Sequence, residues 1–328
     1  MTARWWAALG AALFLAAFLS LLVGSADIPV GDVVGCLAGQ GDPKAVTVIR
    51  EIRLPRMLLG LLVGGALGIS GAALQGLLRN PLAEPGLVGT SASAGLGSVV
   101  AIYFGWAAAW PLALPLAAIG TGAVGTVLLL LAAGRQAGPM TLILSGVAIS
   151  SLAVALTSLA MNLSPNPYAL TEMVLWLMGS LKDRSMQDVV LAAPFVALGG
   201  ALLSLTGRGL DALSLGEEAA ASLGVDLQRL RHMIVMGCAL AVGGAVATAG
   251  AVGFVGLVVP HLLRPLARQR PSLLLLPSAL GGALLITLAD ITARVVPSSS
   301  EMMLGVLTSI VGAPFFLTLL LKMRRSHA

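Results

Sequence analysis

Apolar residues are grouped along this chain into long runs that contain few charges and are separated by short polar segments. A helix that crosses a hydrocarbon core about 30 Å thick needs about 20 apolar residues. By that measure the sequence predicts ten membrane-spanning helices, over residues 5–24, 55–78, 86–104, 112–134, 138–163, 188–206, 232–251, 253–267, 273–294 and 302–321. The eighth is short and contains Pro260, His261 and Arg264, so we expect part of it to lie outside the hydrocarbon.

The composition supports a membrane protein. Of the 328 residues, 58% are hydrophobic and 10% are charged, with a mean hydropathy of +0.98, whereas soluble domains carry about 25% charged residues. The forty glycines fit this class, because small residues let membrane helices approach closely. We therefore predict an all-α polytopic membrane protein in contact with lipid, with residues 1–328 forming one transmembrane domain. The net charge of +5 is attributed to basic helix anchors and not to nucleic-acid binding.

The distribution of Lys and Arg predicts which helix ends face the cytoplasm. With the N-terminus inside and ten alternating helices, twelve basic residues fall on the cytoplasmic side and seven on the external side. Both termini are therefore expected in the cytoplasm. Residues 5–24 also resemble a signal peptide, since Gly24-Ser25-Ala26 is similar to a cleavage site. A permanent first helix is favoured because many more apolar runs follow.

Two charged features fall on the external side. The sequence RLPR, from Arg53 to Arg56, stands against the second helix and runs against the general charge bias. Asp290 and Arg294 are four residues apart at the external end of the ninth helix. That spacing places them on one helical face and predicts an ion pair.

An internal repeat is indicated by two glycine-rich segments. GGALGISGA (64–72) and GGAVATAGA (243–251) share the frame GGAxxxxGA, and the prolines that follow them, Pro81 and Pro260, have the same offset of 179 residues. The first copy is expected to run from outside to inside and the second from inside to outside. This is the pattern of inverted repeats in transporters, with units of about 55–163 and 232–321.

The longest cytoplasmic loop with helical character is DALSLGEEAAASLGVDLQRLR, residues 211–231. Its apolar positions fall on one face: Leu213, Leu215, Ala219, Ala220 and Leu223. Gly224 is typical of a helix stop, and Asp226 is typical of the start of a second short helix. On sequence alone the loop is either a solvated connector or a docking surface for a cytoplasmic partner.

The sequence lacks the residues that several kinds of chemistry require. The chain has no G-x-x-x-x-G-K-[ST] phosphate loop, so it is not expected to hydrolyse ATP itself. His261 lies near no other histidine or cysteine, whereas zinc would need three or four ligands. Cys36 and Cys238 are expected in different environments, so no disulfide is predicted. In the segment 79–95, RNPLAEPGLVGTSASAG, the two prolines indicate a tight turn in which Glu84 is the only acid.

Four segments together resemble the FecCD family of ABC importer permeases, which import iron-siderophores, haem and vitamin B12. They are RLPR (53–56), RNPLAEPGLVG (79–89), LGEEAAASLGV (215–225) and GFVGLVVPH (253–261). The resemblance covers about residues 50 to 321. Two segments depart from the family pattern: SSSEMMLG (298–305) stands where ELPVG is frequent, and RPLARQRPS (264–272) is more basic than usual.

The resemblance implies a ten-helix subunit of the bacterial inner membrane. It implies a homodimer with the pathway at its two-fold axis, lined by the helices over 138–163 and 302–321. Two cytoplasmic ATPases would use ATP, a periplasmic binding protein would deliver cargo, and the permease itself would bind no cofactor. The resemblance places coupling helices in 211–231, at Leu215, Gly216, Glu217, Glu218, Ala219, Ala220, Leu223 and Gly224. It also implies that Arg53, Arg56 and Arg294 receive glutamates of the binding protein, a task that suits the planar guanidinium.

The expected cargo is a bulky metal chelate, with haem or a ferric siderophore ahead of cobalamin because iron transporters are the more numerous members. The methionines near the external mouth would suit a large apolar ring, with core packing as the alternative: Met161, Met173, Met302 and Met303. The rival function is a stand-alone secondary transporter or channel. Carriers of that kind usually keep ionisable groups in mid-span, and these are scarce here. A membrane enzyme has no candidate catalytic set.

Overall fold

The computed structural model describes residues 3–134, 138–297 and 301–326, and every regular element in these ranges is a helix. Eight of these helices are long and apolar enough to cross a membrane, and they coincide with eight predicted spans. They are α1 (Ala3–Leu22), α4 (Leu54–Leu77), α7 (Ala113–Ala133), α8 (Pro139–Asn162), α10 (Met186–Leu205), α13 (Leu227–Ala249), α15 (Pro271–Val295) and α16 (Leu304–Ser326). The chain is therefore a helical membrane protein, as predicted.

The other two predicted spans, 86–104 and 253–267, fall on shorter helices, α5 (Thr90–Tyr103) and α14 (Val255–Leu263). Each apolar run contains a residue in the left-handed region before its helix begins. Gly89 (φ 80°) follows the 3-10 turn η2 (Pro85–Val88), and Phe254 (φ 66°) precedes α14. Ten membrane crossings thus remain a prediction.

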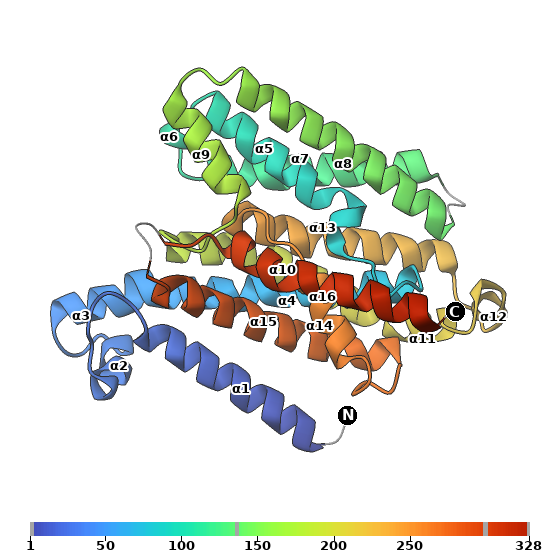
Figure 1. Ribbon diagram of the computed structural model, residues 1–328, viewed down its shortest axis with the longest axis horizontal. Coiled ribbons are helices and arrows are strands. Elements are labelled where there is room, and N and C mark those ends of the chain that lie inside the picture. Colours follow the sequence, from blue (N-terminus) through green and yellow to red (C-terminus); the bar gives the residue numbers. More distant parts are fainter. Residues whose placement is uncertain (1–2, 135–137, 298–300, 327–328) are drawn as a thin grey trace.

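Short helices that the apolar runs did not reveal connect the long ones. They are α2 (Val30–Leu37), α3 (Pro43–Thr47), the π-helical turn η1 (Val48–Arg53), α6 (Trp106–Ala109), α9 (Pro167–Leu177), α11 (Gly207–Leu213) and α12 (Glu217–Ser222). The long helices run along one axis (Figure 1), so the bundle has two ends. We call them the α3 end and the α12 end. The first and last helices begin and end, respectively, at the α12 end.

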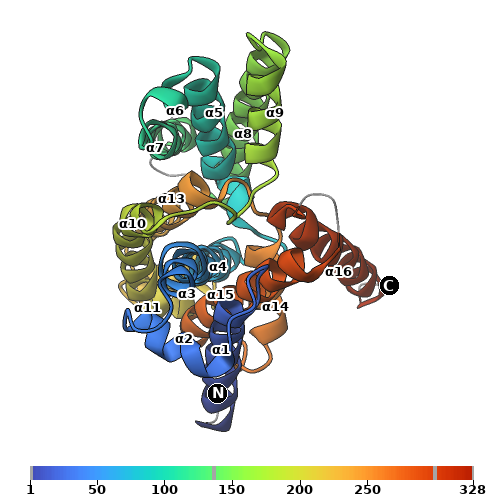
Figure 2. The ribbon, with the colours of Figure 1, turned by 90° about the vertical axis from the view of Figure 1, so that its left-hand side faces the viewer.

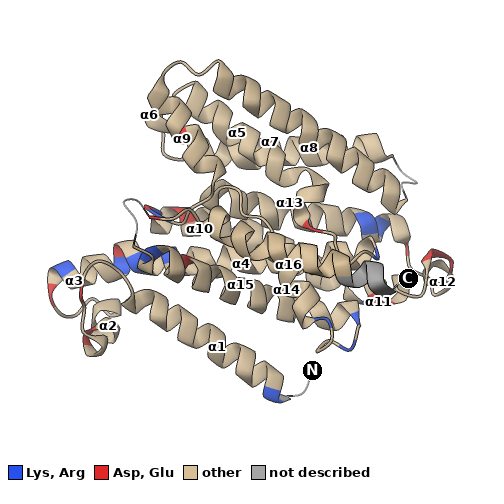
Figure 3. Cartoon of the chain, in the orientation of Figure 1, with Lys and Arg blue, Asp and Glu red and all other residues tan. Residues whose placement is uncertain are grey.

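The other helices are arranged around α4. Helix α4 lies between α10, α13 and α15. Helices α5, α7, α8 and α9 form a second group that packs against α13 through α5 and α7, and α16 stands at the edge of the end-on view (Figure 2). Lys, Arg, Asp and Glu gather mainly at the two ends, and most of the bundle between them is uncharged (Figure 3). This distribution suits a bundle that crosses a hydrocarbon layer, where charged side chains are expensive.

The two helices that carry the GGAxxxxGA frame are the most buried of the eight spans. In both α4 and α13, 72% of the membrane window is buried. Helix α4 begins at the α3 end and α13 begins at the α12 end, so the two frames run in opposite directions. This agrees with an inverted pair of helices, but a repeat of whole halves stays a prediction.

Glycine explains why α4 and α15 pack so closely. A Cβ atom on Gly64 would overlap the backbone of Gly282, and one on Gly68 would overlap the carbonyl group of Ser278. Next to them, a Cβ on Gly65 would make only an ordinary contact, 3.7 Å from the carbonyl oxygen of Ala279. The close approach therefore depends on particular glycines, as in other membrane helix pairs.

Candidate functional sites

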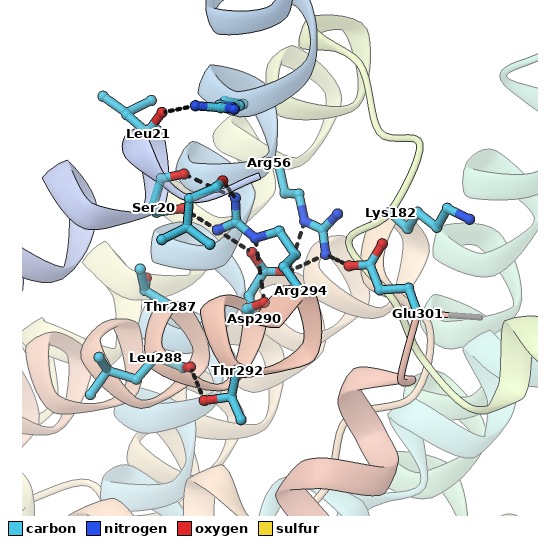
Figure 4. A network of polar contacts seen from close by, with 12 residues as sticks. Ser20, Leu21, Arg56, Lys182, Thr287, Leu288, Asp290, Thr292, Arg294 and Glu301 are labelled. Atoms are coloured by element: carbon cyan, nitrogen blue, oxygen red, sulfur yellow. Dashed lines mark hydrogen bonds and ion pairs between the residues drawn. The ribbon is translucent and has the colours of Figure 1, made fainter. Parts of the chain in front are cut away.

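A cluster of buried charges lies at the α3 end, where α4 begins and α15 ends (Figure 4). We call it the arginine cluster; its members are Arg53, Arg56, Asp290, Arg294 and Glu301. The predicted ion pair on α15 is confirmed, since Arg294 Nη2 lies 2.9 Å from Asp290 Oδ2. The other carboxylate oxygen of Asp290 accepts from Arg56, whose Nε and Nη2 lie 2.9 and 2.8 Å away. Arg56 also forms an ion pair with Glu301.

Two of these arginines also hold the end of α1. Arg53 Nη1 donates to the carbonyl oxygens of Leu21 and Leu22, both at 2.8 Å, and its Nη2 donates to Ala26. Arg294 Nη1 donates to the carbonyl oxygens of Ser20 and Val23, both at 2.9 Å. The last carbonyls of a helix have no partner within the helix and carry partial negative charge. Cationic donors therefore stabilise α1 where it meets α4 and α15.

The three arginines predicted to receive a partner are thus brought together, but each already has partners within the chain. Arg53 and Arg56 are buried, with 3% and 8% of their surface exposed. A cavity of about 330 Å³ borders all three arginines and Glu301. The binding-protein docking role of Arg53, Arg56 and Arg294 stays a prediction. The sequence indicated that basic residues gather here, but the capping of α1 depends on helix packing that no local pattern reveals.

At the opposite end, α12 projects from the bundle (Figure 1), and α11, which precedes it, packs against α4 and α15. Of the predicted apolar face, Leu213 and Ala220 are buried, whereas Leu215 and Leu223 are 69% and 65% exposed. Gly224 (φ 83°) ends α12, as predicted for a helix stop. This short pair therefore presents leucines outward while its other apolar residues hold it to the bundle.

The prediction of a second short helix that starts at Asp226 is wrong. Asp226 does begin a helix, because its Oδ1 accepts from the Arg229 backbone N–H at 2.9 Å, but that helix is the 23-residue α13. No helix-breaking residue separates Asp226 from the long apolar run, so the helix continues. Glu217 of α12 pairs with Arg231 of α13 at 2.9 Å, which fixes the α11–α12 pair to a long helix.

Asp211 connects α11 to the start of α15. Its carboxylate accepts from the Ser272 backbone N–H at 2.8 Å, from the Ser272 hydroxyl at 2.6 Å and from Arg270 Nη2 at 3.0 Å. Burial disfavours the charged form, but these hydrogen bonds outweigh it and lower the pKa of Asp211 below its ordinary value of 3.8. Motion of the α11–α12 pair would therefore be transmitted to α15.

A larger cavity, of about 650 Å³, lies between the two ends of the bundle, beside Leu67 in the middle of α4. The turn after α4, the segment before α14 and the first turns of α16 supply most of its wall: Glu84, Pro85, Gly86, Ala251, Val252, Gly253, Phe254, Gly305, Val306, Ser309 and Ile310. Most of these residues are apolar or small, and among the residues that the structure describes Glu84 is the only ionisable one that borders the cavity. Residues about 170 positions apart in sequence thus share one wall.

The helices implied by the family resemblance contribute unequally to this cavity. Helix α16 borders it directly, whereas α8 contacts the turn beside it, where a Cβ on Gly146 would overlap the Leu87 carbonyl oxygen. Met161, Met302 and Met303 do not border it. Met161 packs instead into a small apolar cluster with the fully buried Met173, which fits the alternative of core packing.

Glu84 carries the most unusual electrostatics of the cavity wall. Burial raises the pKa of its carboxyl above the ordinary value of 4.5, and a hydrogen bond from the Phe254 backbone N–H only partly opposes this. The sequence had marked Glu84 as the one acid in its turn. This lone acid in an otherwise uncharged turn was the sequence signal that could have assigned Glu84 to a functional site.

Replacing Glu84 with glutamine should therefore stabilise the protein at high pH. Because the folded-state pKa is raised, stability falls as pH rises from 4.5 through that pKa and stays lower above it. Glutamine imitates the protonated form, so we expect Glu84→Gln to raise the melting temperature at pH 8 and to leave it unchanged near pH 4. Thermal unfolding in detergent at both values, with the exposed Glu172→Gln as control, measures this. A lower melting temperature of Glu84→Gln at pH 8 would show that the ionised carboxylate stabilises the fold.

Comparison with known families decides the identity. Residues 12–322 match the model of the FecCD transport family. The chain belongs to the FecCD family. The resemblance seen in its motifs is thereby confirmed over almost the whole length, including the arginine cluster, the cavity wall and the α11–α12 pair.

Relatives of this FecCD permease span nearly its full length. It is 39% identical over 324 residues to the vitamin B12 import system permease protein BtuC of Salmonella typhi. That alignment covers 98% of this chain and 96% of BtuC. It is 38% identical over 327 residues to YvrB of Bacillus subtilis, an uncharacterised ABC transporter permease protein, which covers 95% of this chain and 92% of YvrB.

Solved structures agree with the fold. One, described as an inward-facing conformation of a metal-chelate type ABC transporter, has a TM-score of 0.87 and 33% sequence identity and covers 98% of this chain and 100% of its own. PsaBC from Streptococcus pneumoniae has a TM-score of 0.52 at 14% identity, with 88% of this chain and 95% of its own covered, which shows likeness of fold alone.

The FecCD permease is therefore the membrane subunit of a metal-chelate or vitamin B12 type ABC importer. In such importers the ATPase activity lies in a separate subunit, as the missing phosphate loop predicted. The family also implies ATPase subunits and a binding protein as partners. The rival interpretation, a transporter that works alone, receives no support from these relatives.

Proposed function

We propose that two copies of this chain form the pathway of an ATP-driven importer that moves a bulky metal chelate from the periplasm to the cytoplasm. The α3 end faces the periplasm and receives the binding protein, and the α12 end faces the cytoplasm and receives the ATPases. Both termini are then cytoplasmic. The observation that carries the proposal is a mostly apolar cavity beside α16 that lies between a buried arginine cluster and a leucine-bearing helix pair.

A homodimer is supported by α8 and α16, two spans with little internal packing, although α1 buries still less of its membrane window, 17%. Helices α8 and α16 bury only 22% of their membrane windows within one chain. Their outer faces are therefore available to a second copy or to lipid. A copy placed against α16 would close the 650 Å³ cavity from that side and provide a larger enclosure for the cargo.

For the cargo, we place a corrinoid ahead of haem or a ferric siderophore, which reverses the ranking made from family size. The reason is the 39% identity to a permease that is named for vitamin B12. The mostly apolar wall suits a large ring system with few charges. The methionine contacts expected from the sequence do not enter this argument, because Met161, Met302 and Met303 are not among the residues that border that wall.

Uptake into proteoliposomes tests the cargo. The permease is reconstituted with its ATPase and binding protein, and ATP-dependent uptake of cyanocobalamin, haemin and ferrichrome is measured in parallel. We expect cyanocobalamin to accumulate at least about tenfold above the other two. Accumulation of haemin or ferrichrome in its place would refute the choice of cargo and leave the importer intact.

A further inference from the structure

The three arginines of the arginine cluster differ in the kind of partner that they hold. Arg53 and Arg294 donate to backbone carbonyls at the end of α1, which are fixed in place by that helix. Asp290 lies on α15 with only 3% of its side chain exposed. Glu301 stands outside any helix, and 18% of its side chain is exposed. The Arg56–Glu301 ion pair is therefore the one that can open by rotation of a side chain.

The surroundings of this ion pair suit an exchange of carboxylates. The 330 Å³ cavity borders both Arg56 and Glu301, so another side chain can reach the guanidinium from there. The cluster holds three cations and two anions, and departure of Glu301 would leave one carboxylate facing three guanidinium groups. A buried guanidinium without a carboxylate is costly, so a replacement anion would be bound well.

We propose that Glu301 is an internal substitute for a carboxylate of the docking partner. It occupies Arg56 in the undocked permease and is displaced when a carboxylate of the binding protein pairs with Arg56. Arg53 and Arg294 hold the end of α1 in both states and do not exchange. This inference rests on the proposed docking function of the α3 end.

The exchange of carboxylates at Arg56 would also affect the 650 Å³ cavity. Glu301 lies three residues before α16, and α16 supplies Gly305, Val306, Ser309 and Ile310 to the cavity wall. The first residue of α16 is held separately, because the Leu304 N–H donates to the Gly179 carbonyl oxygen at 2.9 Å. Loss of the Arg56 contact thus removes one of the attachments of the segment that leads into α16. Docking would then change how firmly the start of this helix is held.

The affinity of the binding protein for the nanodisc-held permease–ATPase complex tests the proposal. Glu301→Gln keeps the shape of the side chain but removes the competing charge, so we expect docking to tighten about tenfold. The control is Glu51→Gln, which removes an equally charged, exposed group from the same end and should change affinity less than about twofold. In addition, Ile310→Cys should react faster with a methanethiosulfonate reagent when combined with Glu301→Gln.

The outcomes separate this proposal from the function on which it rests. If Arg56→Glu abolishes docking while Glu301→Gln leaves the affinity unchanged or weaker, the internal substitute is refuted and the docking site stands. If Arg56→Glu leaves docking unchanged, the docking site itself is refuted. Should Glu301→Gln fail to fold, Glu301→Asp withdraws the charge by one methylene and is expected to tighten docking about threefold. Unchanged or weaker docking by that variant would equally overturn the proposal.

Discussion

Gly64→Ala should strongly destabilise the protein, whereas Gly65→Ala should be tolerated. The added methyl group at residue 64 would overlap the backbone of Gly282, which cannot move without shifting α15 away from α4. Overpacking of a core costs about 1–3 kcal/mol where side chains can adjust, and more is expected against backbone. At residue 65 the same methyl group meets the Ala279 carbonyl oxygen at 3.7 Å.

Size-exclusion chromatography and thermal unfolding of the two variants in detergent measure this difference. We expect Gly64→Ala to give little monodisperse protein, or a melting temperature well below that of the parent. Gly65→Ala is a matched control because it makes the same chemical change one residue away on the same helix. Equal behaviour of the two variants would show that the close approach of α4 and α15 is not required for folding.

The second large effect is expected at the α11–α12 pair. Leu223 is 65% exposed on a helix end that reaches away from the bundle. If it is an anchor for the ATPase, Leu223→Glu places a charge in an apolar contact, and the loss of one such anchor weakens binding by at least about tenfold. ATP-dependent uptake should fall with it, while the melting temperature of the permease stays unchanged.

Val34→Glu is the control for this experiment. Val34 is 67% exposed on α2, at the opposite end of the bundle, so the same change in polarity occurs far from the proposed contact. Affinity for the ATPase is measured by interferometry on nanodisc-held permease. Unchanged ATPase affinity in Leu223→Glu would remove the coupling role from this end of α12. Equal losses in both variants would point to a general effect on the protein.

Long helices could be predicted from the sequence because a bilayer leaves few alternatives. A backbone in hydrocarbon must satisfy its own hydrogen bonds, so an uncharged run of about 20 residues forms a helix. The predicted bounds 138–163 match α8 (Pro139–Asn162), and 273–294 match α15 (Pro271–Val295), within about two residues. Gly89 takes a left-handed conformation within the run 86–104, and α14 ends at Leu263 within the run 253–267, so both predictions were too long.

The candidate sites were predictable only as far as they are local. The spacing of Asp290 and Arg294 predicted their ion pair, because four residues make one helical turn. The capping of α1 by Arg53 depends on contacts 27 to 32 residues away in sequence. The cavity wall joins Glu84 to Phe254, and the Arg56–Glu301 pair joins α4 to the segment before α16. Such contacts follow from packing of whole helices and leave no periodic pattern.

The most direct test of the account is the energy source of transport. Cyanocobalamin uptake is measured in proteoliposomes that hold the permease with or without its ATPase, in the presence of the binding protein. The account predicts uptake only when the ATPase and ATP are both present, with no uptake driven by proton or sodium gradients. Gradient-driven uptake by the permease without the ATPase would contradict it.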